Sequence, residues 1–277
     1  MSASDSPPPL PSDPVAVVAG FTPPSGGATP LGSVIRAMLS LELKAWMGPK
    51  LWVKMVCAAL ALVVLTRLAL SRSNPAQFER WMLEVVALRF VPLLCLAVGG
   101  GILRNAIRSY TIEYLWTRSV RKFHLVIAAW LTAVVVVTLL VFMATAMVHL
   151  TGSVTGVEGI WRKFPMTCTA EFALILPFTA IAVALGVWTG KYMVTGLLYG
   201  FVVETGISRI PTNLNLLAVS RHAEVLLKQA RQSLEGPGLL VVLQSTGALM
   251  LLTAAGLLVA CIIFVRKQYS IGAEKEI

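Results

Sequence analysis

The chain has 277 residues, of which 57% are hydrophobic and 13% are charged, and its mean hydropathy is +0.79. A soluble domain carries about 25% charged residues, so this composition excludes an ordinary soluble protein. The formal charge of +10 comes from Lys and Arg near the ends of apolar runs, which argues against nucleic-acid binding. We therefore predict an all-α polytopic membrane protein, because a helix needs about 20 apolar residues to cross a bilayer core of about 30 Å.

The N-terminal 50 residues divide into two parts. Residues 1–30 lack the basic start and apolar core of a signal peptide, and their Pro, Ser and Gly content predicts a disordered tail. Residues 31–50 carry apolar side chains at spacings of three and four, interrupted by Arg36, Glu42 and Lys44. This pattern predicts an amphipathic helix in the membrane interface. A short helix packed on the protein's own loops is the alternative.

Six apolar segments follow and predict a six-span transmembrane domain over residues 51–267. The predicted spans are about 51–70, 84–103, 123–150, 170–188, 192–207 and 239–265, of which the fifth is the weakest. The stretch 208–238 is too polar to span, and its helical periodicity predicts one or two short extracytoplasmic helices before the last span. Residues 268–277 form a short charged tail.

An even number of spans places both termini on one side of the membrane. With both termini in the cytoplasm, Lys and Arg are in modest excess inside, whereas Glu residues that include Glu171 and Glu204 fall outside. We therefore predict a multi-pass protein of the cytoplasmic membrane with both termini in the cytoplasm.

A charged segment, YTIEYLWTRSVRK at 110–122, separates the second and third predicted spans. It is too short to form a domain, and with the predicted topology it faces the cytoplasm. As a helix, the longer segment 104–122 aligns Ile107, Tyr110 and Tyr114 on one stripe and leaves Glu113 where a partner's basic groups can pair with it. This arrangement is typical of a segment that contacts a soluble partner. A solvated basic turn that only fixes the topology is the alternative.

The run TIEYLWTRSV at 111–120 resembles the cytoplasmic loop of type-2 ABC exporter permeases. In that family a T-x-E-x-L-x-(T/S)-R-P-V-like stretch forms the coupling helix that docks on the nucleotide-binding subunit. Here Ser119 stands where proline is common, and Tyr110 stands where a small residue often precedes the threonine. The resemblance extends from about residue 31 to the C-terminus. It implies a permease that pairs with a second copy or a paralogue and exports cargo from the cytoplasm of a bacterium or archaeon.

The resemblance also implies which residues contact the ABC ATPase subunit. These residues are Arg108, Thr111, Glu113, Leu115, Thr117, Arg118 and Arg121. The chain contains no GxxxxGK[ST] motif to hold phosphates, so ATP and Mg²⁺ belong to the partner and this chain binds no cofactor. It also contains no HExxH or GxSxG motif and no metal-ligand spacing. We therefore expect no catalytic residue, no metal site and no enzymatic activity of its own.

Charged residues inside spans are costly and are therefore candidate functional sites. Arg89 and Glu204 are the two clearest, each about one turn from the predicted outer surface. They either snorkel to that surface or form an ion pair or a contact to polar cargo. The glycines at 99–101 either permit close helix approach or mark the end of a span. Pro92 and Pro177 are expected to kink their helices.

Two other functions stay open. An ion-coupled secondary transporter needs paired carboxylates or broken helices at mid-membrane and inverted repeats, and the sequence shows none convincingly. A non-transporting membrane scaffold would recruit a complex without moving cargo. The few polar side chains in the spans permit a lipid or amphipathic cargo but do not identify one.

Overall fold

The computed structural model describes residues 31–46, 64, 66–67, 75–108, 121–157, 159–206, 218–231 and 238–267. This part of the chain is almost entirely helical, which confirms the all-α class. The helices are α1 (Leu31–Trp46), α3 (Pro75–Trp81), the π-helix η2 (Met82–Phe90), α4 (Val91–Arg108), α6 (Lys122–Val154), α7 (Ile160–Trp188), α8 (Tyr192–Tyr199), the π-helix η3 (Gly200–Gly206), α9 (Val219–Arg231) and α10 (Gly238–Arg266). The predicted tails at 1–30 and 268–277 lie outside the described residues.

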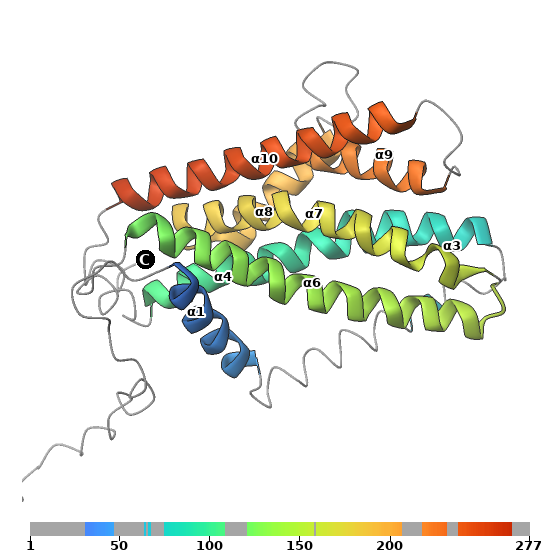
Figure 1. The fold of residues 1–277 in the computed structure, drawn as a ribbon, viewed down its shortest axis with the longest axis horizontal. Coiled ribbons are helices and arrows are strands. Elements are labelled where there is room, and N and C mark those ends of the chain that lie inside the picture. The colour runs from blue at the N-terminus through green and yellow to red at the C-terminus, as the bar shows by residue number, and fades with distance from the viewer. Residues whose placement is uncertain are drawn as a thin grey trace, which may run out of the picture.

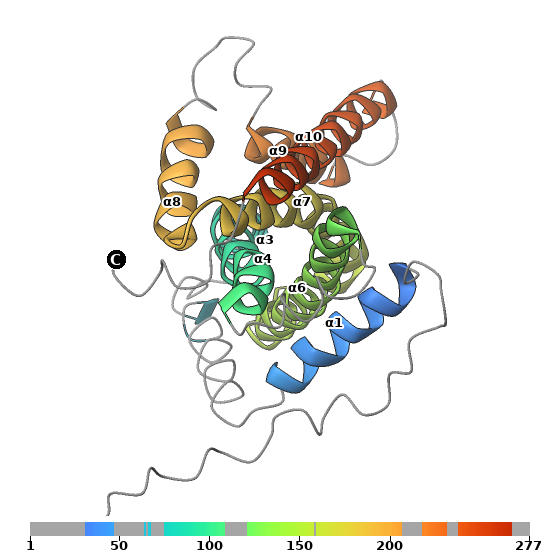
Figure 2. The same cartoon turned by 90° about the vertical axis from the view of Figure 1, so that its left-hand side faces the viewer.

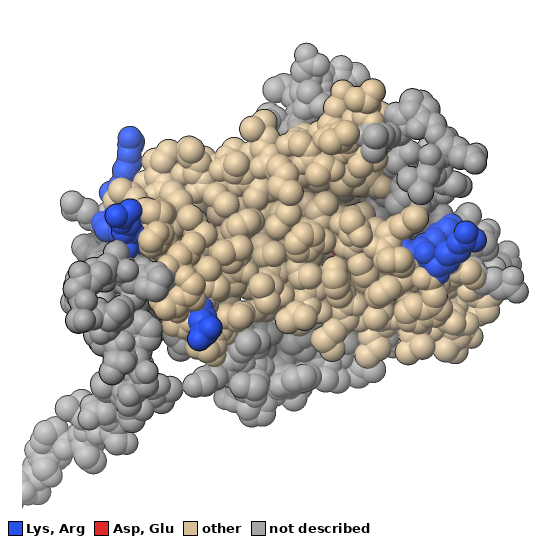
Figure 3. Space-filling model, in the orientation of Figure 1, with Lys and Arg blue, Asp and Glu red and all other residues tan. Residues whose placement is uncertain are grey.

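Four helical segments among the described residues are long and apolar enough to cross a membrane. They are Met82–Asn105, Lys122–Val154, Ile160–Trp188 and Leu240–Arg266. Each extends along the long axis of the molecule, and together they form the bundle (Figure 1). On the face shown in Figure 3, Lys and Arg lie toward the two ends and the long middle is uncharged. The membrane-protein class predicted from the sequence agrees with this arrangement.

The predicted fourth span begins too late. The sequence predicts a start at 170, whereas α7 begins at Ile160 and includes Arg162, Lys163 and Pro165. These three residues have the composition of a loop, yet they occupy the first two turns of the helix. A proline this early removes one main-chain hydrogen bond and leaves the rest of the helix intact. Pro177 likewise lies inside α7, which continues through it.

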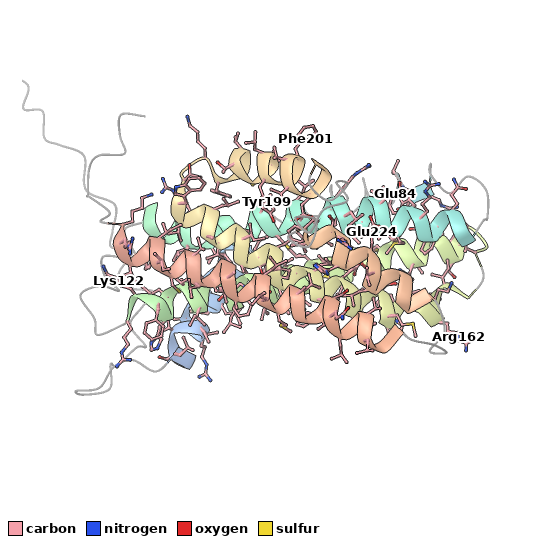
Figure 4. All side chains as sticks on the ribbon, turned by 90° about the horizontal axis from the view of Figure 1, so that it is seen from above. Glu84, Lys122, Arg162, Tyr199, Phe201 and Glu224 are labelled. Atoms are coloured by element: carbon pink, nitrogen blue, oxygen red, sulfur yellow. The ribbon has the colours of Figure 1, made fainter. Side chains whose placement is uncertain are left out.

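The predicted fifth span is a shorter element. α8 and η3 together cover Tyr192–Gly206, and 15 helical residues extend roughly 20 Å, less than the 30 Å or so of a bilayer core. This helix lies along one side of the bundle and reaches only part of its length (Figures 1 and 4). Four long spans therefore lie among the described residues, and the predicted count of six is not confirmed. The predicted first span at 51–70 lies almost entirely outside them.

The predicted amphipathic helix is present as α1. It crosses the end of the bundle at which α6 begins, and in Figure 2 it lies across the long axis of the spans. Val34 and Met38 are buried in the main core, where α1 packs against α6, and Arg36 is exposed. α1 therefore packs against the membrane-length helix α6. The alternative prediction, in which this helix packs only on the protein's own loops, does not describe this contact.

A π-helical stretch precedes Pro92. η2 ends at Phe90, and the Val91 N–H donates to the carbonyl of Val86, five residues back. A proline ring conflicts with the carbonyl four residues before it, here that of Leu88. The wider π turn relieves this conflict. The sequence predicts a kink at Pro92, and the structure shows a π-helix directly before it.

Small residues bring α4 and α7 into close contact. A Cβ added at Gly99 would lie 3.1 Å from the Cβ of Ala182, and one added at Gly186 would lie 2.9 Å from the Cα of Gly100 and closer still to its carbonyl oxygen. Small residues allow membrane helices to pack backbone against backbone. Of the two predicted roles of the glycines at 99–101, the structure shows close helix approach.

We expect Gly186→Ala to destabilise the protein by about 1–3 kcal/mol, because its methyl group would overlap the backbone of Gly100 and force α4 away from α7. Gly247→Ala in α10 is the matched control, since no atom lies within 4 Å of its added Cβ. That change should be neutral or slightly stabilising. Thermal unfolding of the two variants in the same detergent compares them, and equal midpoints would contradict the close contact.

Candidate functional site

The predicted coupling segment connects α4 to α6 in the sequence. α4 ends at Arg108 and α6 begins at Lys122, and both termini lie at the same end (Figures 1 and 2). Arg121 is exposed at the N-cap position of α6, with an extended backbone. The segment 109–120 between them lies outside the described residues, and with it Thr111, Glu113, Leu115, Thr117 and Arg118.

The same end of the bundle carries further basic residues. Lys191 follows α7, and Arg266 ends α10. Lys267 Nζ donates hydrogen bonds to the carbonyl oxygens of Val187 at 3.3 Å and Trp188 at 3.1 Å. The last carbonyls of a helix lack intrahelical donors and carry partial negative charge, so this lysine caps α7 and joins its end to that of α10. We call this region the basic end, defined by Arg108, Arg121, Lys122, Lys191, Arg266 and Lys267.

The opposite end of the bundle also carries charge. Arg162 and Lys163 are exposed in the first turn of α7. Arg80 Nε donates to Glu84 at 2.8 Å, and this hydrogen bond raises the pKa of Arg80, although an exposed pair contributes little to stability. Figure 4 shows Lys122 and Arg162 at opposite ends of the molecule. Lys122 and Arg162, which the sequence assigns to opposite membrane faces, therefore lie at opposite ends of the bundle.

The two intramembrane candidates have different surroundings. Arg89 is exposed on η2, as expected for a side chain that extends to the interface. Glu204 accepts hydrogen bonds from the backbone N–H groups of Val219 at 3.2 Å and Ser220 at 2.8 Å, and from the Tyr199 hydroxyl at 3.2 Å. Val219 and Ser220 begin α9, so Glu204 caps that helix from another segment. The sequence did not predict this structural role.

Among the described residues, the most deeply buried carboxyl group is that of Glu171, which the sequence does not mark as a candidate site. From the sequence, Glu171 is counted with the outside residues, because it is the second residue of the fourth predicted span, 170–188, at the outer end of that span. In the structure it lies three turns inside α7 and its side chain is fully buried. The hydroxyl of Thr145 on α6 lies 2.9 and 2.8 Å from its two carboxyl oxygens. The signal in the sequence is an acidic residue at the second position of the fourth predicted span.

His149 lies one turn beyond Thr145 on α6 and is also buried. Its Nδ1 lies 2.8 Å from the carbonyl oxygen of Thr145, and a carbonyl only accepts, so Nδ1 carries the hydrogen. The rings of Phe78, Trp161 and Phe164 surround the imidazole at centroid distances of 5.5, 6.0 and 5.1 Å. We call the three polar residues the buried polar cluster, defined by Thr145, His149 and Glu171.

The described part of the chain holds no group of three or more His, Cys, Asp or Glu residues that could bind a metal ion. No protein-family model matches this chain, and no curated protein matches it. The features of the described residues that bear on function are therefore the bundle, the basic end and the buried polar cluster.

Proposed function

We propose that this chain is the transmembrane permease subunit of an ATP-driven type-2 ABC exporter in the cytoplasmic (inner) membrane. One observation carries the proposal: the segment with the coupling-helix resemblance joins two membrane-length helices at the basic end, where α1 crosses the bundle. In this proposal the basic end faces the cytoplasm and both chain termini lie there. The partners are an ABC ATPase subunit, which binds ATP and Mg²⁺, and a second permease copy or paralogue.

The packing of the spans supports a mechanical role for that segment. α4 and α6 both pack against α7, and α4 does so through direct backbone contact at Gly99 and Gly100. Closely packed interiors transmit displacement because they compress little. A push on the segment between α4 and α6 would therefore move α7 and, through it, α10. In this mechanism closure of the ATPase subunits rocks the spans, and cargo leaves through the permease interface or along its lipid-facing side.

The experiment that tests this function is a pull-down of the tagged full-length protein from its native membrane in mild detergent. We expect a stoichiometric ATPase with a phosphate-binding loop to copurify, and its ATPase activity to rise in the presence of this chain. Recovery of the protein without any ATPase would contradict the proposal.

A specific observation favours a second candidate, an ion-coupled secondary transporter. Glu171 is buried inside a membrane-length helix. The change from α8 to the π-helix η3 interrupts the α-helical pattern before Glu204, which caps α9. Buried carboxyls and interrupted helices are features of ion-coupled transport. Transport that follows an ion gradient and does not need ATP would identify this function.

A further inference from the structure

Glu171 is a buried ionisable side chain that has no role in the proposed coupling mechanism. It belongs neither to the coupling segment nor to the contact between α4 and α7. It lies between α6 and α7 with no exposed surface, and among the described residues Thr145 is its one hydrogen-bonding partner. An ionised carboxylate at such a position is costly unless a cation or several donors compensate for its lost hydration. The chain thus keeps a carboxyl where its charged form is poorly supported.

The geometry at Thr145 fits a neutral carboxylic acid. A threonine hydroxyl has one hydrogen to donate and two lone pairs to accept with. A protonated Glu171 donates its O–H to Thr145 Oγ1 while its other oxygen accepts the Thr145 hydrogen, and the 2.8 and 2.9 Å distances allow both bonds. A carboxylate would offer two acceptor oxygens to a single shared hydrogen. The neutral form is therefore satisfied by this one partner, and the charged form is not.

The ionisable groups around α6 and α7 do not supply a counter-charge to Glu171. His149 on α6 already donates its Nδ1 hydrogen to the Thr145 carbonyl, and Cys168 precedes Glu171 by one turn of α7. The remaining described ionisable side chains of these two helices are Lys122 and His124 on α6 and Arg162 and Lys163 on α7. Those of neighbouring elements are Arg36 on α1, Glu84 and Arg89 on η2, Cys95 and Arg104 on α4, Tyr192 and Tyr199 on α8, Arg221, His222 and Glu224 on α9, and Cys261 and Arg266 on α10. None of these groups forms a hydrogen bond or an ion pair with Glu171.

We propose that Glu171 and Thr145 form a proton-binding site inside the membrane bundle, with His149 on the path between this site and the bundle end that carries Arg162. Solvent exposure increases along this path. Glu171 and His149 are buried, whereas Trp161, whose ring lies beside that of His149, is about half exposed. On release, the O–H bond of Glu171 breaks and its proton passes by way of His149 to water. The products are a Glu171 carboxylate and a hydronium ion.

Proton occupancy of this site controls the packing of α6 against α7. The carboxylate left by proton release needs water or other donors, so the two helices must separate to admit them. Because α6 begins at the basic end and α7 contacts α4, α6, α9 and α10, this separation reaches most of the bundle. A proton-binding site at Glu171 is compatible with the permease and with the ion-coupled transporter, because it depends only on how α6 and α7 pack.

The test is infrared spectroscopy of the full-length protein at neutral pH in a detergent without ester groups, whose carbonyls would absorb in the same region. A protonated carboxyl has a C=O stretching band separate from those of a carboxylate. We expect this band in the wild-type protein and its loss in Glu171→Gln. Glu204→Gln is the matched control and should leave the band in place, because Glu204 accepts from two N–H groups and a hydroxyl.

Thr145→Val is the second variant, and it keeps the test decisive if Glu171→Gln does not fold. It removes the hydrogen bond to the acid while Glu171 remains, so the band should shift to higher frequency without losing intensity. A band that Glu171→Gln and Thr145→Val both leave unchanged would overturn the proposal. Disappearance of the band on addition of Na⁺ or K⁺ at constant pH would also overturn it and would identify a cation site.

Discussion

Glu113→Arg is expected to abolish the copurification of an ATPase subunit with this protein. In the proposed permease, Glu113 lies in the segment between α4 and α6 and pairs with basic groups of the ATPase. Reversing its charge removes that pairing and opposes like charges, which costs several kcal/mol at an interface. A loss of about 3 kcal/mol weakens binding roughly a hundredfold. Quantifying the ATPase recovered with the tagged variant measures this effect, and partner-stimulated ATP hydrolysis should be lost with it.

Arg162→Glu provides the matched control for this charge reversal. Arg162 is exposed at the opposite end of the bundle from Lys122, so its reversal should leave the ATPase attached (Figure 4). Arg162→Glu should unfold at the wild-type temperature because Arg162 is exposed. In the proposed permease Glu113 faces the ATPase and not the spans, so Glu113→Arg should unfold at that temperature as well. Recovery of the ATPase at wild-type stoichiometry with Glu113→Arg would show that the motor docks elsewhere.

Glu204→Ala should destabilise the protein by about 2–4 kcal/mol and loosen α9. The substitution leaves the N–H groups of Val219 and Ser220 without their acceptor, and Val219 is fully buried. Each unsatisfied buried donor costs about 1–3 kcal/mol, and loss of an N-terminal cap costs about 0.5–2 kcal/mol by itself. Amide hydrogen exchange should accelerate in peptides from 218–231 and stay unchanged in those from α6.

Glu84→Ala is the control for Glu204→Ala, because Glu84 is exposed and pairs only with exposed Arg80. A surface pair of this kind contributes about 0–1 kcal/mol, so its removal should hardly change the unfolding temperature. If the two alanine variants unfold alike and exchange in α9 stays slow, Glu204 is not the cap that holds this helix.

The long spans were predictable because a membrane helix must satisfy its own backbone hydrogen bonds, so length and hydropathy suffice to locate it. The third and sixth predicted spans, 123–150 and 239–265, correspond to α6 at Lys122–Val154 and α10 at Gly238–Arg266. The start of α7 was not predictable in this way. Its first turns carry Arg162, Lys163 and Pro165, and hydropathy cannot distinguish a polar helix end from a loop.

The polar contacts depend on how the helices face each other. Thr145 and Glu171 are 26 residues apart, and Glu204 and Ser220 are 16 apart, so neither pair forms a local motif. The sequence gives the glycines at 99–101 two possible roles, close helix approach or the end of a span. Only the position of Gly186 on α7 distinguishes these two roles.

The sequence by itself determined the membrane class, four long apolar helices among the six predicted spans, and the amphipathic helix now seen as α1. These properties follow from composition and periodicity, which act locally along the chain. Only the tertiary structure decided that Glu171 is enclosed between α6 and α7, that Glu204 caps α9, and that Gly186 contacts Gly100. Each of these features depends on which helix faces lie against each other. Tertiary packing determines this, because the partners are far apart in the sequence.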